Sequence, residues 1–83
     1  MTTCAQIEEA YTVAMIELAD ARTATPREQN KAVWNFAKKF GAKATKGRTD
    51  GSWLLRVNGV PSKMAASTGA AIETLAIMLR ELV

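Results

Sequence analysis

The first periodic run of apolar residues covers residues 3–21. Its apolar positions recur four, three and four residues apart, at Ile7, Tyr11, Ala14 and Leu18. Acidic side chains occupy the other positions of the wheel, so the pattern predicts an amphipathic helix. Thr3 and Gln6 have the spacing of a capping box, which would satisfy backbone N–H groups at the start of this helix.

A second helix is predicted to begin at Pro26. Thr25 stands at the N-cap, Pro26 at the first helical position and Glu28 at the third. The apolar stripe of this helix consists of Val33, Phe36, Ala37 and Phe40. Gly41 follows, where a left-handed C-terminal cap is needed. Trp34 lies off the stripe, so we expect it either to meet the first helix or to be partly exposed.

Beyond Gly41 the helical period stops and a strand pattern begins. Residues 42–48 and 52–57 are predicted to pair around Asp50-Gly51. Alternation places three apolar side chains on one face of this sheet: Trp53, Leu55 and Val57.

The segment after residue 57 has two interpretations. Asn58-Gly59 indicates a type I′ hairpin turn, after which residues 60–65 return as a third strand that Pro61 keeps at the sheet edge. The last helix then begins after Ser67; alternatively, Ser62 caps a longer helix that replaces the third strand. We favour Ser67, because the hairpin signal needs a second strand. The stripe of this helix is Ile72, Leu75, Ala76 and Leu79, extended by Leu82 and Val83.

Together these elements predict an α+β fold in one compact domain, residues 1–83. Two N-terminal helices precede a small two- or three-stranded antiparallel sheet, and a C-terminal helix packs on it. A chain of 83 residues with 48% apolar content supports one core. The chain shows no signal-peptide pattern near Met1 and no apolar run approaching the roughly 20 residues that span a bilayer. We therefore expect a cytoplasmic protein that is not embedded in a membrane.

The composition removes most catalytic chemistry. There is no histidine, and Cys4 is the only cysteine, so the usual general base and the usual metal clusters are missing. Glu8 and Glu9 are adjacent and point to different faces of a helix, which argues against a paired-carboxylate site. Residues 41–49 superficially resemble a phosphate-binding loop, but the spacing is wrong and Arg48 replaces the required lysine. We expect no enzymatic activity, no cofactor and no metal.

Charge is unevenly distributed along the chain. Residues 1–21 carry four acidic and no basic side chains, whereas residues 22–63 carry ten basic side chains against two acidic ones. We expect the basic segment, whose cations are interleaved with Trp34 and Trp53, to dock on nucleic acid or on an acidic protein surface, with Trp34 as a possible exposed aromatic. The predicted contact residues are Arg27, Lys31, Lys38, Lys39, Lys43, Lys46, Arg48, Arg56 and Lys63. In the opposing interpretation, the acidic first helix folds back and neutralises part of this surface.

Parts of the chain share features with two nucleic-acid-binding families. Ala37 and Gly41 have the turn spacing of a helix-turn-helix, but residues 42–50 lack the apolar residues that a recognition helix needs. The helix, three strands and helix expected over residues 26–83 are loosely similar to a double-stranded-RNA-binding domain. Of the lysines that grip phosphates in that family only Lys63 is present, so the resemblance does not carry RNA binding over.

The alternative function is protein binding. Small chains of mixed charge without an active site are common among phage and mobile-element accessory proteins that inhibit or adapt a host protein complex. The acidic first helix and exposed apolar residues would make the contacts. Three methionines could add an adaptable contact surface, although methionine more often fills a core. They are Met15, Met64 and Met78.

Overall fold

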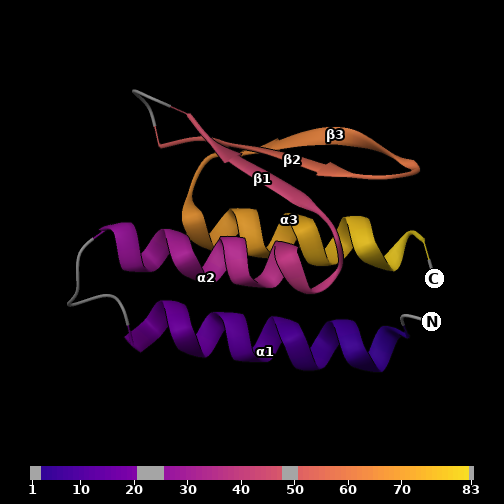
Figure 1. Ribbon diagram of the computed structural model, residues 1–83, viewed down its shortest axis with the longest axis horizontal. Helices are drawn as coiled ribbons and strands as arrows, with labels where there is room; N and C mark the ends of the chain where they lie inside the picture. The colour runs from indigo at the N-terminus through magenta and orange to yellow at the C-terminus, as the bar shows by residue number, and fades with distance from the viewer. Residues whose placement is uncertain (1–2, 21–25, 48–50, 83) are drawn as a thin grey trace.

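The computed structural model describes residues 3–20, 26–47 and 51–82. It confirms the predicted α+β order of two helices, an antiparallel sheet and a C-terminal helix, and it resolves the sheet into three strands (Figure 1). The elements are α1 (Cys4–Asp20), α2 (Pro26–Lys39), β1 (Lys43–Lys46), β2 (Trp53–Val57), β3 (Val60–Ala65) and α3 (Thr68–Arg80).

The elements form three layers (Figure 1). The sheet has the order β1-β2-β3, and both pairings are antiparallel. Helix α3 packs against β2 and β3, whereas α2 packs beside α3 and against β1. Helix α1 contacts α2 and α3 and, within the described residues, no strand. All three helices therefore lie on one side of the sheet, and its other face carries no described element.

Local side-chain chemistry determines where the helices begin. At the start of α1, the Thr3 backbone N–H donates to Gln6 Oε1 at 2.9 Å and the Gln6 N–H donates to Thr3 Oγ1 at 3.2 Å, which confirms the capping box. Pro26 is the first residue of α2, as predicted, while its expected N-cap Thr25 lies outside the described residues. At α3, Ser67 Oγ accepts the Ala70 N–H at 3.1 Å, so Ser67 and not Ser62 caps this helix.

Gly41 ends α2 through a pair of backbone hydrogen bonds. The Ala42 N–H donates to the Ala37 carbonyl at 2.9 Å, and the Gly41 N–H donates to the Lys38 carbonyl at 3.4 Å. This is the Schellman arrangement, in which the residue after the C-cap needs positive φ, and Gly41 has φ 68°. The chain then enters β1, so the second helix of a helix-turn-helix is absent from this position.

The core lies between the sheet and the helices. The predicted sheet face of Trp53, Leu55 and Val57 is buried. The predicted stripe of α3 is buried as well, and Met78 joins it as core filler. In α2 the stripe is confirmed, with Phe36 1% exposed and in edge-to-face contact with half-buried Phe40.

The structure changes three details of the predicted pattern. The innermost residues of α1 are Ile7, Ala10 and Ala14, because this helix rests on two other helices and only its narrow central stripe is buried. Helix α3 ends at Arg80, so Leu82 does not extend the stripe and is half exposed. The third strand follows Asn58-Gly59 as predicted, but the turn is not type I′: that type needs positive φ at both residues, and only Gly59, at 87°, has it.

Candidate binding surfaces

One face of α2 carries three cations and a tryptophan. They follow one another at intervals of four, three and four residues, which brings their side chains to the same side of the helix. All four side chains are exposed. The row is about 16 Å long at the usual helical rise of 1.5 Å per residue. We call this surface the α2 basic face; it consists of Arg27, Lys31, Trp34 and Lys38.

Trp34 is fixed at the middle of the α2 basic face. Its indole N–H donates to the Ala44 carbonyl at 3.1 Å, and its ring makes an edge-to-face contact with buried Trp53 at 5.7 Å between centroids. The residue is nevertheless 41% exposed. The sequence left two placements open for Trp34; the structure shows partial exposure, and the contacts described are with β1 and β2.

Trp34 covers the free edge of the sheet. The Gly47 N–H donates to the Ser52 carbonyl at 2.7 Å, so these two residues form a hydrogen-bonded pair of the β1–β2 ladder. Hydrogen-bonded and non-hydrogen-bonded pairs alternate along an antiparallel ladder. Ala44 therefore belongs to a non-hydrogen-bonded pair, and its backbone N–H and carbonyl point away from β2. The indole therefore satisfies a carbonyl on an edge strand, where an uncovered row of polar groups invites pairing with another chain. Nearby, Lys46 Nζ donates to Asn30 Oδ1 at 3.3 Å, so Lys46 joins β1 to α2.

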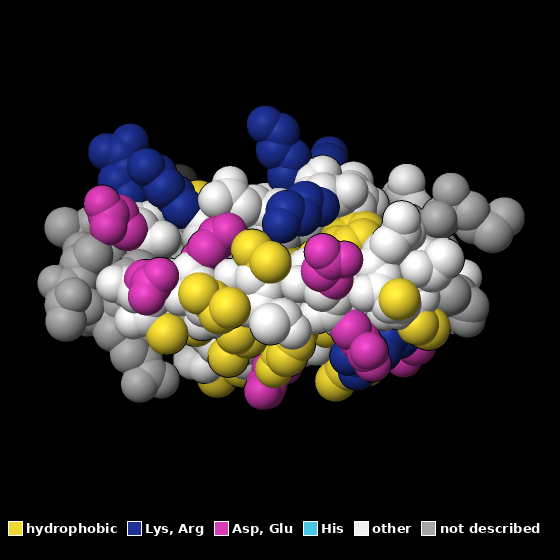
Figure 2. Space-filling model, turned by 90° about the horizontal axis from the view of Figure 1, so that it is seen from below, with side chains coloured by type: hydrophobic (Ala, Val, Ile, Leu, Met, Phe, Trp, Pro, Cys, Tyr) yellow, Lys and Arg dark blue, Asp and Glu magenta, His cyan; other side chains and the backbone are white. Residues whose placement is uncertain are grey.

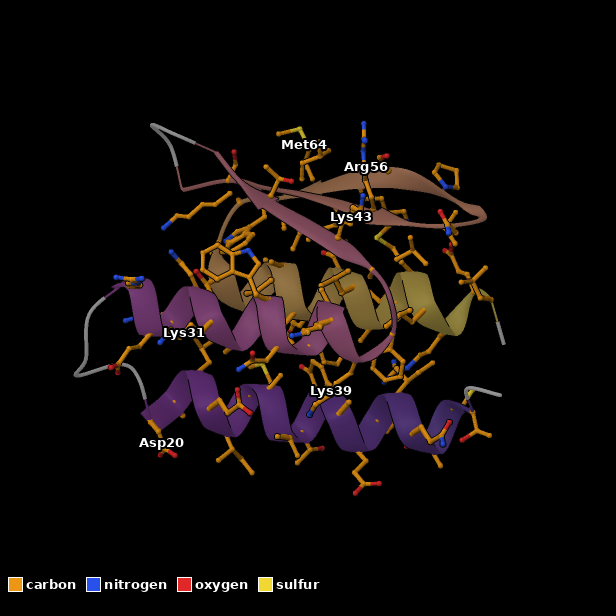
Figure 3. The ribbon with its side chains drawn as sticks, viewed as in Figure 1. Asp20, Lys31, Lys39, Lys43, Arg56 and Met64 are labelled. Atoms are coloured by element: carbon orange, nitrogen blue, oxygen red, sulfur yellow. The ribbon has the colours of Figure 1, made fainter. Side chains whose placement is uncertain are left out.

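A second pair of cations lies on the uncovered face of the sheet. Lys43 of β1 is directly opposite Arg56 of β2, and both side chains are exposed (Figure 3). Leu54 and Met64 form the neighbouring cross-strand pair on this face, and Met64 is 69% exposed. The sequence indicated Met64 as core filler or as part of an adaptable surface, and the structure shows it exposed; Leu54 was not anticipated. The alternation of β2 does indicate this placement, because Leu54 and Arg56 must face the side of the sheet opposite to Trp53, Leu55 and Val57.

The remaining predicted contact residues lie elsewhere. Lys39 is on the side of α2 that is turned toward α1 (Figure 3). Lys63 opposes Leu55 on the helix side of the sheet and forms an ion pair with Glu81 at 3.6 Å. Arg48 lies outside the described residues. The basic segment is thus divided between the α2 basic face, the Lys43 and Arg56 pair, and isolated cations.

The acidic helix does not pair directly with the α2 basic face. Within residues 3–20 and 26–47, no ion pair joins a carboxylate of α1 to a cation of α2. From below, most lysine and arginine side chains project from one long edge of the molecule, while carboxylates are scattered among apolar side chains (Figure 2). The cations of α2 therefore remain available to an external anion.

No family model, curated protein or solved structure matches the chain. Among the described residues, no three side chains of the metal-ligating types gather into a group that could hold an ion. No described helix combines the length and apolarity needed to cross a membrane. Cys4 is a free, exposed thiol at the start of α1.

Proposed function

We propose that this protein is a cytoplasmic, non-enzymatic binding module that docks its α2 basic face on nucleic acid. The observation that carries the proposal is the exposed tryptophan fixed between cations on one helix face. A row of positive charge attracts the phosphate backbone and releases its counterions, which supplies most sequence-independent affinity. An exposed aromatic ring adds stacking on an unpaired base, which contributes roughly 1–3 kcal/mol per base.

The fold also supports a rigid mode of docking. Both ends of α2 are defined, by Pro26 at its start and by the Gly41 cap at its end, and its inner side is buried against α1, α3 and β1. Trp34 is held by a hydrogen bond and by a ring contact. A preorganised aromatic loses little conformational freedom on binding, so more of the contact energy appears as affinity.

The first test is a salt titration of binding to labelled single-stranded and duplex oligonucleotides, followed by fluorescence anisotropy. We expect micromolar affinity at low salt and a steep linear fall of log K with log salt. Stacking on Trp34 predicts tighter binding of the single strand and quenching of tryptophan fluorescence, both reduced in Trp34→Leu. Absence of binding to either oligonucleotide at low salt would contradict the proposal.

A second candidate function rests on α1, and it is the inhibitor or adaptor of a host protein complex. Ile16 is 56% exposed and Val13 38%, on a helix whose other outward positions include Glu9 and Asp20. An apolar patch rimmed by carboxylates is typical of a protein contact. This candidate predicts a host protein that co-purifies with the chain and is lost in Ile16→Ser, while Lys31→Gln retains it.

A further inference from the structure

A polar cleft lies on the uncovered side of the sheet, at the end that holds the β2–β3 turn. Its volume is about 400 Å³, and it is open to solvent. Four of its side chains are potential hydrogen-bond donors from different parts of the sheet: Lys43 on β1, Arg56 on β2, Asn58 in the turn and Ser62 on β3. The lining also includes Gly41 and Gly59.

Two like charges are neighbours in the lining of this cleft. Lys43 and Arg56 are directly opposite in the β1–β2 register, and the ladder alternation makes them a hydrogen-bonded pair, whose Cα atoms are typically about 5.5 Å apart. Like charges directly opposite destabilise a sheet. Within the described residues, neither side chain forms an ion pair with a carboxylate. An anion bound between them would replace this repulsion by attraction.

A β-bulge shapes the side of the cleft at Arg56. Leu55 pairs with Lys63 and Val57 pairs with Val60, so two residues of β3 stand opposite the single residue Arg56. Those two residues are Pro61 and Ser62. Pro61 has no N–H to give to the ladder, and a bulge is one of the few places in a sheet that accept it. Bulges redirect side chains and occur next to functional sites, and here the bulge brings Ser62 beside Arg56.

The remaining lining keeps the cleft open. Gly59 has φ 87° and Gly41 has φ 68°, conformations that favour glycine. At Gly41 a Cβ would enter open space, so this glycine leaves its side of the cleft unfilled. Arg56 provides a planar fork of donors that matches phosphate oxygens, and Lys43 provides a compact charge. Ser62 and Asn58 can donate neutral hydrogen bonds to the same group.

We propose that this cleft binds a phosphate group, held by Lys43 and Arg56 and oriented by Ser62 and Asn58. The group is either free inorganic phosphate or a phosphate of a nucleic-acid strand. The site is separate from the α2 basic face and does not depend on the function proposed for that face. The cleft would act as an anion site even in a protein that binds no oligonucleotide.

The test is a titration of the full ¹⁵N-labelled chain with inorganic phosphate at constant pH and ionic strength, followed by amide NMR. We expect saturable shifts confined to the cleft, at Gly41, Asn58, Gly59 and Ser62. Arg56→Gln should weaken this binding roughly tenfold or more, because a charged hydrogen-bonding partner is lost. Lys39→Gln, outside both the cleft and the α2 basic face, removes the same charge and should leave the phosphate affinity unchanged.

A parallel titration with an oligonucleotide distinguishes the two sources of phosphate. If the cleft takes a backbone phosphate, the same amides shift with the oligonucleotide, and Arg56→Gln weakens that binding as well. If it takes free phosphate, only α2 amides respond to the oligonucleotide. Linear, unsaturated phosphate shifts spread over the whole wild-type surface, or equal phosphate affinities of wild type and Arg56→Gln, would overturn the cleft proposal. If only the α2 proposal fails, the oligonucleotide will leave the chemical shifts of the α2 amides unchanged, while inorganic phosphate still shifts the cleft amides.

Discussion

At the scale of single residues, Trp34 links stability to the candidate function. Its indole N–H satisfies a carbonyl on the edge of β1, and its ring lies against Trp53 in the core. Trp34 is nevertheless 41% exposed, on the helix face that also holds Lys31 and Lys38. The same residue therefore protects the sheet edge and presents an aromatic surface among cations.

Trp34→Phe tests the structural half of this arrangement. The substitution keeps an aromatic ring but removes the hydrogen bond to the Ala44 carbonyl, so the free energy of unfolding should fall by about 0.5–1.5 kcal/mol. Equilibrium urea denaturation of both proteins measures the difference. Unchanged stability would mean that water replaces the indole at this carbonyl without cost.

The sequence predicted residues whose role depends on their immediate neighbours. The capping box of Thr3 and Gln6, the proline start of α2 and the Ser67 cap each involve groups within a few positions of one another. The partner of Trp34 could not be predicted in this way. It depends on β1 passing beside α2, which is a tertiary contact between residues ten positions apart.

At the scale of elements, α1 is attached to the rest of the fold only through other helices within the described residues. One polar contact spans α1 and α3: the Tyr11 hydroxyl donates to Glu73 Oε1 at 3.3 Å. Burial and then the charge of Glu73 raise the pKa of Tyr11 above its usual value of 10.0. The neutral phenol is therefore favoured in the folded state.

This contact predicts how stability changes at alkaline pH. Well below pH 10 the phenol is neutral in both the folded and the unfolded chain, so its stabilising contact is fully present. As the pH rises past that value the unfolded chain loses the proton first, because the folded pKa is higher, and stability falls. Tyr11→Phe removes this contribution, so its urea midpoint should decline less between about pH 9 and 11. Equal declines in the two proteins would show that Tyr11 titrates normally.

The periodicity and capping signals of the sequence predicted where the elements begin and end, but they did not predict how the elements pack together. A stripe at helical spacing identifies α1 as amphipathic without showing that it rests on α2 and α3 and leaves Ile16 exposed. The bulge opposite Arg56 was also beyond the sequence pattern, since it depends on a one-residue register shift between β2 and β3. Pro61 marked an edge strand correctly but gave no indication of that shift.

At the scale of the whole molecule, acidic and basic side chains lie in different layers of the fold, as they lie in different segments of the sequence. Acidic α1 lies farthest from the sheet, while the basic segment forms α2, β1, β2 and most of β3 (Figure 1). Cations are thereby placed on the exposed face of α2 and on the uncovered face of the sheet. This separation is the physical basis of the proposed binding to nucleic acid, because attraction falls off within a Debye length of roughly 10 Å.

The most direct measurement is the salt dependence of oligonucleotide binding in two variants with equal loss of charge. The first variant changes the α2 basic face and carries Arg27→Gln, Lys31→Gln and Lys38→Gln. The second changes cations outside that face and carries Lys39→Gln, Lys63→Gln and Arg80→Gln. If the face makes the contacts, the magnitude of the negative slope of log K against log salt should decrease by roughly two to three units in the first variant and stay near the wild-type value in the second. Equal slopes in the two variants would contradict the account, since binding would then depend on net charge and not on the α2 basic face.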